Sequence, residues 1–146
     1  MIEISSNSKE VRQRLDARKA ALKQKAANGI LQASLFLEGK MVEKISLNLL
    51  APPLKKETIR RKGSSRVLFD KGYLLQQIDK RISKDGLTAE VGVFDGKEKR
   101  AYIALIHEYG APAAGIPERS FMRSTLEENR KGLKKIFMKA GDYSHH

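Results

Sequence analysis

Apolar positions in the first third of the chain recur at the intervals of an α-helix, and their density changes halfway. They are sparse and set among charges up to residue 28, and they form a dense stripe after it. The pattern predicts a long helical segment over residues 1–50, capped by an Asn7–Glu10 pair or by Ser8. Asn28-Gly29 is expected to interrupt it, because glycine costs about 1 kcal/mol in a helix relative to alanine. The denser half is expected to be core, and the sparser, basic half to project outward or to pack on a neighbouring subunit. The apolar positions are Val11, Leu15, Leu22 and Ala26, followed by Ile30, Leu31, Leu35, Leu37, Met41, Val42 and Ile45.

Residues 51–72 lack a periodic apolar pattern and are rich in basic side chains. Two prolines after Ala51 end the helix, because proline supplies no N–H and restricts the residue before it. A short helical turn is expected around residues 57–61, followed by a Gly-Ser-Ser loop. Asp70 is expected to cap the next turn, and Gly72 to adopt a backbone conformation that other residues avoid. This segment is therefore predicted to be a basic loop.

The clearest strand pattern lies between residues 81 and 94. Runs at 81–83 and 88–94 flank Lys84-Asp85-Gly86, and Asp-Gly between strand-like runs is typical of a hairpin. Ala89, Val91 and Val93 alternate with Glu90 and Gly92, as one buried sheet face requires. A polar turn follows, and then an apolar segment that predicts a short helix ended by Gly110. Residues 73–123 are thus expected to form a small antiparallel sheet with a short helix, and residues 119–123 an edge strand.

The last part of the chain has the pattern of a closing helix. Ser124 and Glu127 have the Ser-x-x-Glu spacing of a capping box, and the helix is predicted over residues 124–141. Residues 142–146 are expected to be a tail, whose histidines are interpreted as part of a purification tag. The order of helix, basic loop, small antiparallel sheet and helix predicts one α+β domain over residues 1–146, with the C-terminal helix packed on the sheet.

Composition and charge narrow the kinds of partner. The 146 residues include no cysteine, which excludes disulfides and thiolate metal sites. Lys and Arg number 29 against 17 Asp and Glu, and the net charge of +12 favours an acidic partner. Seven basic side chains fall in residues 9–25 and seven in residues 55–71, although such runs are usually solvated surface. No apolar stretch approaches the roughly 20 residues that a bilayer crossing requires, so no membrane partner is expected.

Candidate catalytic chemistry is sparse. His107 is the only histidine before the tail, and Ala111 stands where a His-Glu-x-x-His zinc motif would place its second ligand. No phosphate-binding glycine motif occurs. Aromatic residues make up only 6%, so base-stacking platforms are not expected, and contact with nucleic acid would be through phosphates alone. We therefore predict no enzyme activity, no cofactor and no metal.

Four short motifs occur in order between residues 54 and 123. They are Thr-Ile-x-x-Lys-Gly at 58–63, Leu-x-Asp-x-Gly-x-Leu at 68–74, His-Glu-Tyr-Gly at 107–110 and Ile-Pro-x-Arg-x-Phe-Met-Arg at 116–123. In this order they resemble the virion-morphogenesis, or tail-completion, proteins of Mu-like and related tailed phages, and more loosely the minor tail proteins of lambda-like phages. The chain departs from that pattern at Lys71, Gln77, Glu118 and Ser120. The motif positions are Asp70, Gly72, Leu74, His107, Glu108, Tyr109, Gly110, Pro117, Arg119 and Phe121.

The resemblance implies a structural protein that acts in tail completion or head–tail joining, without a cofactor. It implies assembly in the bacterial host cytoplasm and a final place in the tail or neck of the virion. The expected partners are other tail or connector proteins and further copies of the chain, in a ring that in such proteins often has six subunits. Arg119 is expected at an interface or in a local ion pair, and Phe121 in the core. The alternative is a sequence-nonspecific nucleic-acid-binding protein of phage origin. The candidate contacts with a partner or with DNA are Lys55, Lys56, Arg60, Arg61, Lys62 and Arg66.

Overall fold

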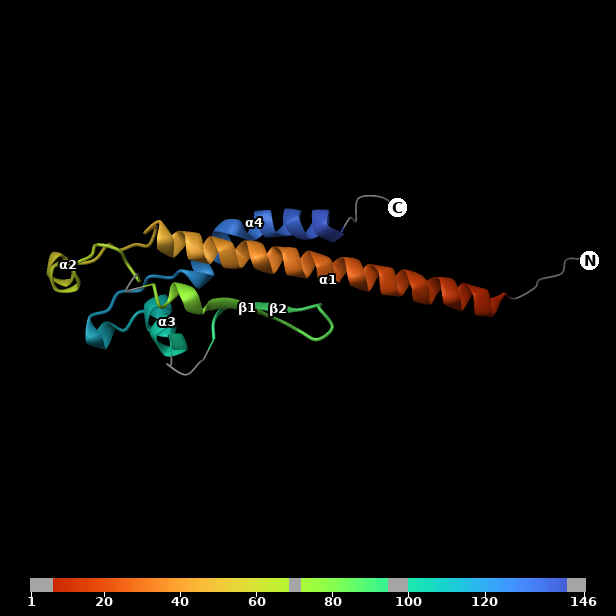
Figure 1. Ribbon diagram of the computed structural model, residues 1–146, viewed down its shortest axis with the longest axis horizontal. Helices are drawn as coiled ribbons and strands as arrows, with labels where there is room; N and C mark the ends of the chain where they lie inside the picture. The colour runs from red at the N-terminus through yellow and green to blue at the C-terminus, as the bar shows by residue number, and fades with distance from the viewer. Residues whose placement is uncertain (1–6, 69–71, 95–99, 142–146) are drawn as a thin grey trace, which may run out of the picture.

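The computed structural model describes residues 7–68, 72–94 and 100–141. A single helix of 39 residues forms the long axis, and at 1.5 Å per residue it is about 58 Å long. The C-terminal helix lies along one side of its second half, and the hairpin lies along another (Figure 1). The elements are α1 (Ser8–Ser46), α2 (Lys56–Lys62), β1 (Ile78–Ile82), β2 (Ala89–Val93), α3 (Arg100–Tyr109) and α4 (Met122–Gly141), with 3₁₀ turns at Leu75–Gln77 and Pro112–Ala114.

The predicted α+β fold is confirmed. Strands β1 and β2 pair antiparallel, with Ile78 opposite Val93 and Ile82 opposite Ala89. Val91 and Val93 pack against the core, as their alternation predicted. α4 has its largest interface with α1, and its first residue, Met122, lies over β2. The short helices predicted around residues 57–61 and 101–109 are α2 and α3.

The core forms where the second half of α1 meets the loop after it, the hairpin, α3 and the start of α4. Apolar side chains from all of these elements are buried together, so residues distant in sequence share one cluster. None of the helices in the described ranges combines the length and the apolar composition that a membrane crossing needs. The predicted cap at Asp70, residues 95–99 of the polar turn predicted at 95–100, and the tail at 142–146 lie outside the described residues. The buried apolar residues are Met41, Ile45, Leu50, Val67, Leu68, Leu74, Ile78, Ala104 and Phe121.

The predicted interruption at Gly29 is wrong, because α1 continues through it without a break. A Cβ at this position would lie 2.6 Å from Cδ2 of Phe137 and 3.0 Å from the Phe137 carbonyl oxygen. The missing side chain therefore gives α4 the room to approach α1. The contact between the two helices compensates for the low helix propensity of glycine.

Replacing Gly29 by leucine is expected to lower the free energy of unfolding by about 1–3 kcal/mol, because the larger side chain overlaps Phe137. Urea denaturation measures the change. The matched control is Gly39→Ala in the same helix, where a Cβ meets nothing within 4 Å. Alanine there should stabilise the protein by about 0.5–1 kcal/mol through helix propensity. Equal stability of Gly29→Leu and the wild type would contradict the packing of α4 on this position.

The start of the closing helix also differs from the prediction. Residues 119–121 are not a strand, and α4 begins at Met122, two residues before Ser124. The Ser124 hydroxyl donates to the Ser120 carbonyl oxygen at 2.5 Å and does not cap the helix start. At the start of α1, the Asn7 amide bonds the Glu10 carboxylate, and no side chain caps the main chain. Both predicted caps therefore fail as backbone caps.

The first half of α1 extends beyond the rest of the molecule (Figure 1). We call residues 8–24 the arm, because every one of them is exposed. The arm is about 25 Å long at 1.5 Å per residue. The sequence left two alternatives for this half of the helix, projection into solvent or packing on a neighbouring subunit. Within the described chain the arm projects away from the body.

Candidate interaction site

The end of α3 is joined to the start of α4 by the carboxylate of Glu108. This residue is only 1% exposed. Its Oε2 accepts the main-chain N–H groups of Phe121 at 2.8 Å and Met122 at 2.9 Å. Its Oε1 accepts the N–H of Arg123 at 2.9 Å and the hydroxyl of Ser120 at 2.7 Å. The first N–H groups of a helix have no partner within it, so Glu108 caps α4 from another helix.

The environment of Glu108 favours its charged form. Burial alone would raise the pKa of this carboxyl, but the hydrogen bonds from Met122, Arg123, Ser120 and Phe121 lower it below its usual value. The positive end of the α4 dipole acts in the same direction. The guanidinium Nε of Arg123 lies 3.1 Å from Oε1 and adds a cation to the site. The charged carboxylate is therefore a structural centre whose two oxygens are both fully engaged.

Arg119 connects this region to the segment that follows α1. Its Nε donates to the carbonyl oxygen of Pro52 at 2.7 Å, and its guanidinium also reaches that of Pro53 at 3.3 Å. Its main-chain N–H donates to the carbonyl oxygen of His107 at 2.8 Å. The side chain is buried, and burial lowers the pKa of Arg119. The expected local ion pair of Arg119 is not found among the described residues, where its guanidinium instead bonds main-chain carbonyl groups distant in sequence. The other expectation, an interface contact, stays a prediction.

The turn between α3 and α4 depends on Gly110. Its φ of +74° is a left-handed conformation that disfavours other residues, and a Cβ would lie 2.8 Å from the main-chain nitrogen of Glu118. The close approach brings residues 116–119 back against the end of α3. We call Glu108, Gly110, Arg119 and Phe121 the motif junction, because these four motif positions meet there.

The other motif positions are distributed more widely. Leu74 is buried in the core, and Gly72 has the positive φ that was expected, +71°. Pro117 and Tyr109 are exposed, and the ring of Tyr109 lies under the Arg123 guanidinium. Asp70 lies outside the described residues.

His107 is a packed residue beside the motif junction. Its Nδ1 is buried and has no hydrogen-bond partner among the described residues. Burial lowers the pKa of His107, and the nearby cations Arg119 and Lys62 lower it further, so the imidazole is neutral at pH 7. No group of three or more metal-ligating side chains gathers anywhere in the described ranges.

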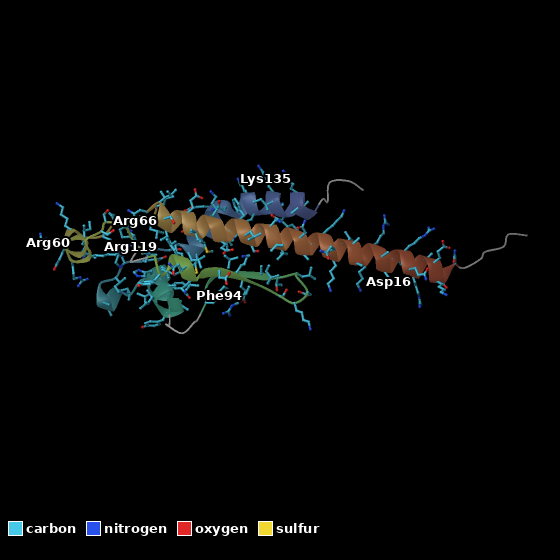
Figure 2. All side chains as sticks on the ribbon, in the orientation of Figure 1. Asp16, Arg60, Arg66, Phe94, Arg119 and Lys135 are labelled. Atoms are coloured by element: carbon cyan, nitrogen blue, oxygen red, sulfur yellow. The ribbon has the colours of Figure 1, made fainter. Side chains whose placement is uncertain are left out.

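The predicted basic contact residues divide into two sets. Lys62 donates to the carbonyl oxygen of Arg66 at 2.9 Å and ties the loop to α2, and Arg66 donates to the carbonyl oxygen of Ser46 at 2.7 Å and ties the loop to α1. Figure 2 shows Arg60 beside α2, at the end of the molecule opposite the arm. We call Lys55, Lys56, Arg60 and Arg61 the basic lobe, because all four are exposed on or next to α2.

Sequence reasoning missed the capping role of Glu108 and placed the cap of α4 at Ser124. Glu108 precedes Phe121 by 13 residues, and no local spacing rule links a carboxylate to a helix that far away. The His-Glu-Tyr-Gly motif was the only signal that singled out Glu108. Comparison of the chain with protein-family models, with curated proteins and with solved structures finds no match in any of the three.

Proposed function

We propose that the chain is a structural, non-enzymatic subunit of a tailed phage or prophage that acts in tail completion or head–tail joining. The motif junction carries this proposal. Glu108, Arg119 and Phe121 belong to two of the four motifs of the resemblance, and all three hold the fold together. Motif residues that build a scaffold support an assembly subunit, because an enzyme's motif residues usually face a substrate.

The exposed surfaces support contacts with neighbouring proteins. The basic lobe lies at one end of the molecule, and the arm extends from the other (Figure 1). A subunit with surfaces at opposite ends of a long helix can contact two different neighbours. We propose acidic tail or connector proteins as partners, together with further copies of the chain in a closed ring, for which six subunits is the working number. Assembly would take place in the host cytoplasm, and the finished protein would lie in the tail or neck.

Deletion of the gene from the phage that encodes it tests the function. We expect filled heads and complete tails that remain separate in electron micrographs, because the joining subunit is missing. The wild-type gene supplied in trans should restore joined particles. Normal virions without the gene, or a gene position outside any cluster of head and tail genes, would refute the proposal.

The double variant Arg60→Glu, Arg61→Glu is expected to lower the yield of joined particles by about tenfold or more. The new glutamates would repel an acidic partner, and such a juxtaposition of like charges costs several kcal/mol. A loss of only about 1.4 kcal/mol already weakens the affinity tenfold. Complementation of the deletion measures the yield. The control is Lys131→Glu, Lys135→Glu, which makes the same change in net charge at exposed positions of α4. Equal yields from the two double variants would remove the basic lobe from the joining contact.

The second candidate is sequence-nonspecific binding of nucleic acid. The observation in its favour is the basic lobe, because four of the seven residues at 55–61 are exposed cations and only one, Glu57, is a carboxylate. Binding of random-sequence duplex DNA should then fall by orders of magnitude between about 50 and 200 mM salt. The Arg60→Glu, Arg61→Glu protein should lose this binding. The absence of binding at low salt would exclude this candidate and leave the assembly role.

A further inference from the structure

One face of α1 continues along the arm after α4 has ended. Leu15, Leu22, Gly29 and Phe36 are spaced by seven residues, so they lie on one face of the helix. α4 covers the second half of this row. Phe137 packs on Gly29, and a Cβ at Gly132 would lie 3.8 Å from the ring of Phe36. The first half of the row is therefore the continuation of an existing helix–helix contact.

The covered part of this face ends close to Asn28. Its side-chain amide donates to the carbonyl oxygen of Ala140 at 2.8 Å, one residue before the end of α4. Farther along the arm, Leu15 is 59% exposed and Leu22 is 56% exposed. Val11, also exposed, lies on the same face. Three large apolar side chains at helical spacing thus form a stripe that nothing in the described chain covers.

Basic side chains border this stripe on both edges. At 100° per residue, Arg14 and Arg18 follow one edge and Arg12 and Lys19 follow the other, all within about 80° of the stripe. The arm's two carboxylates, Glu10 and Asp16, lie about 120° from the stripe. Glu10 is moreover paired with Arg14 at 3.2 Å. The stripe is therefore apolar at its centre and positive at its borders.

We infer that the arm is a docking helix for an amphipathic helix of an acidic partner protein. That helix would place an apolar seam on Val11, Leu15 and Leu22 and its carboxylates against the bordering cations. It would continue along α1 the packing that α4 begins. This inference does not rest on the phage assignment.

Charge and apolar character select this occupant over two others. A second copy carries the same net charge of +12, and its arm would bring cations against cations. Phosphate contact with nucleic acid requires only the basic side chains and would leave the leucines exposed to water. A partner with both an apolar seam and acidic edges satisfies every exposed group of the stripe.

A synthetic four-heptad peptide, with leucine at the a and d positions and glutamate at e and g, serves as the probe. The full chain is expected to bind it in calorimetry at about 50 mM salt, where charges are weakly screened. The variant Leu15→Ala, Leu22→Ala should weaken binding by about tenfold or more, since each truncation removes buried apolar area. The control Gln13→Ala, Gln24→Ala changes the opposite face of the arm and should bind as the wild type does. Hydrogen exchange should slow in residues 8–24 when the peptide binds.

The alternatives give different results. Failure to bind the peptide, equal binding of a scrambled peptide of the same composition, or no effect of Leu15→Ala, Leu22→Ala would each overturn the inference. Self-association in sedimentation that this variant abolishes would assign the stripe to a second copy. Binding of duplex DNA without binding of the peptide would assign the arm to nucleic acid. The folded body should be unaffected, because both leucines are exposed and alanine favours the helix.

Discussion

Replacement of Glu108 by alanine is expected to destabilise the domain by about 3–5 kcal/mol, because several main-chain N–H groups lose their acceptor at about 1–3 kcal/mol for each one left buried. The first-turn N–H groups of Phe121, Met122 and Arg123 would lose their acceptor. Urea denaturation followed by circular dichroism measures the loss. If the alanine variant does not fold, Glu108→Gln, which keeps one acceptor oxygen, is expected to lose about 1–3 kcal/mol.

The control for this prediction is Glu118→Gln. Glu118 also bonds Arg123, at 2.7 Å, but it is exposed, so its loss should cost no more than about 1 kcal/mol. Similar losses at the two positions would contradict the capping role of Glu108.

Glu108 should also make the stability of the protein dependent on pH. The pKa of Glu108 is lower in the folded protein than in the unfolded chain, where the pKa of a glutamate is about 4.3. The folded state therefore binds fewer protons than the unfolded state in acid. The stabilising contribution is complete above the unfolded pKa and is lost as the pH falls through the folded pKa. The Glu108→Gln protein should show a flatter decline of stability below about pH 5, and parallel curves would contradict the assignment.

Truncation of Phe121 to alanine is expected to cost about 3–5 kcal/mol, because it removes a fully buried ring and leaves a cavity. The ring is 0% exposed and belongs to the central core cluster. Thermal and urea unfolding measure the effect. Phe121→Leu should cost less and still fold, which keeps the prediction measurable.

The matched control for Phe121 is Leu126→Ala. Leu126 lies in the first turns of α4 but is 38% exposed, so its truncation should cost much less. Comparable losses at the two positions would show that Phe121 is not central to the core. The variants of Glu108 and Phe121 also distinguish residues that stabilise the fold from the residues of the basic lobe, which are proposed to contact a partner. Variants of the motif junction should lower the yield of joined particles in proportion to their loss of stability. The double variant Arg60→Glu, Arg61→Glu should lower that yield although the protein remains folded.

The sequence by itself determined the elements whose signals are local. The helical period predicted the long N-terminal helix, the apolar segment before Gly110 predicted α3, and Asp85-Gly86 placed the turn of the hairpin correctly. These succeed because helix periodicity and turn chemistry depend on residues within a few positions of one another. The exposed, basic character of the arm also followed from its sparse apolar positions. The candidate site was predictable only as a set of motif residues, without their roles.

Only the tertiary structure decided how these elements are joined. Gly29 predicted a break, but Phe137 from the far end of the chain fills the space above it and keeps the helix continuous. Ser124 predicted the start of α4, but the helix begins two residues earlier, where the carboxylate of Glu108 accepts its first N–H groups. The stripe of Leu15 and Leu22 became an open surface because α4 ends beside Asn28. Each outcome depends on a contact between residues distant in the sequence, and such contacts leave no trace in local spacing.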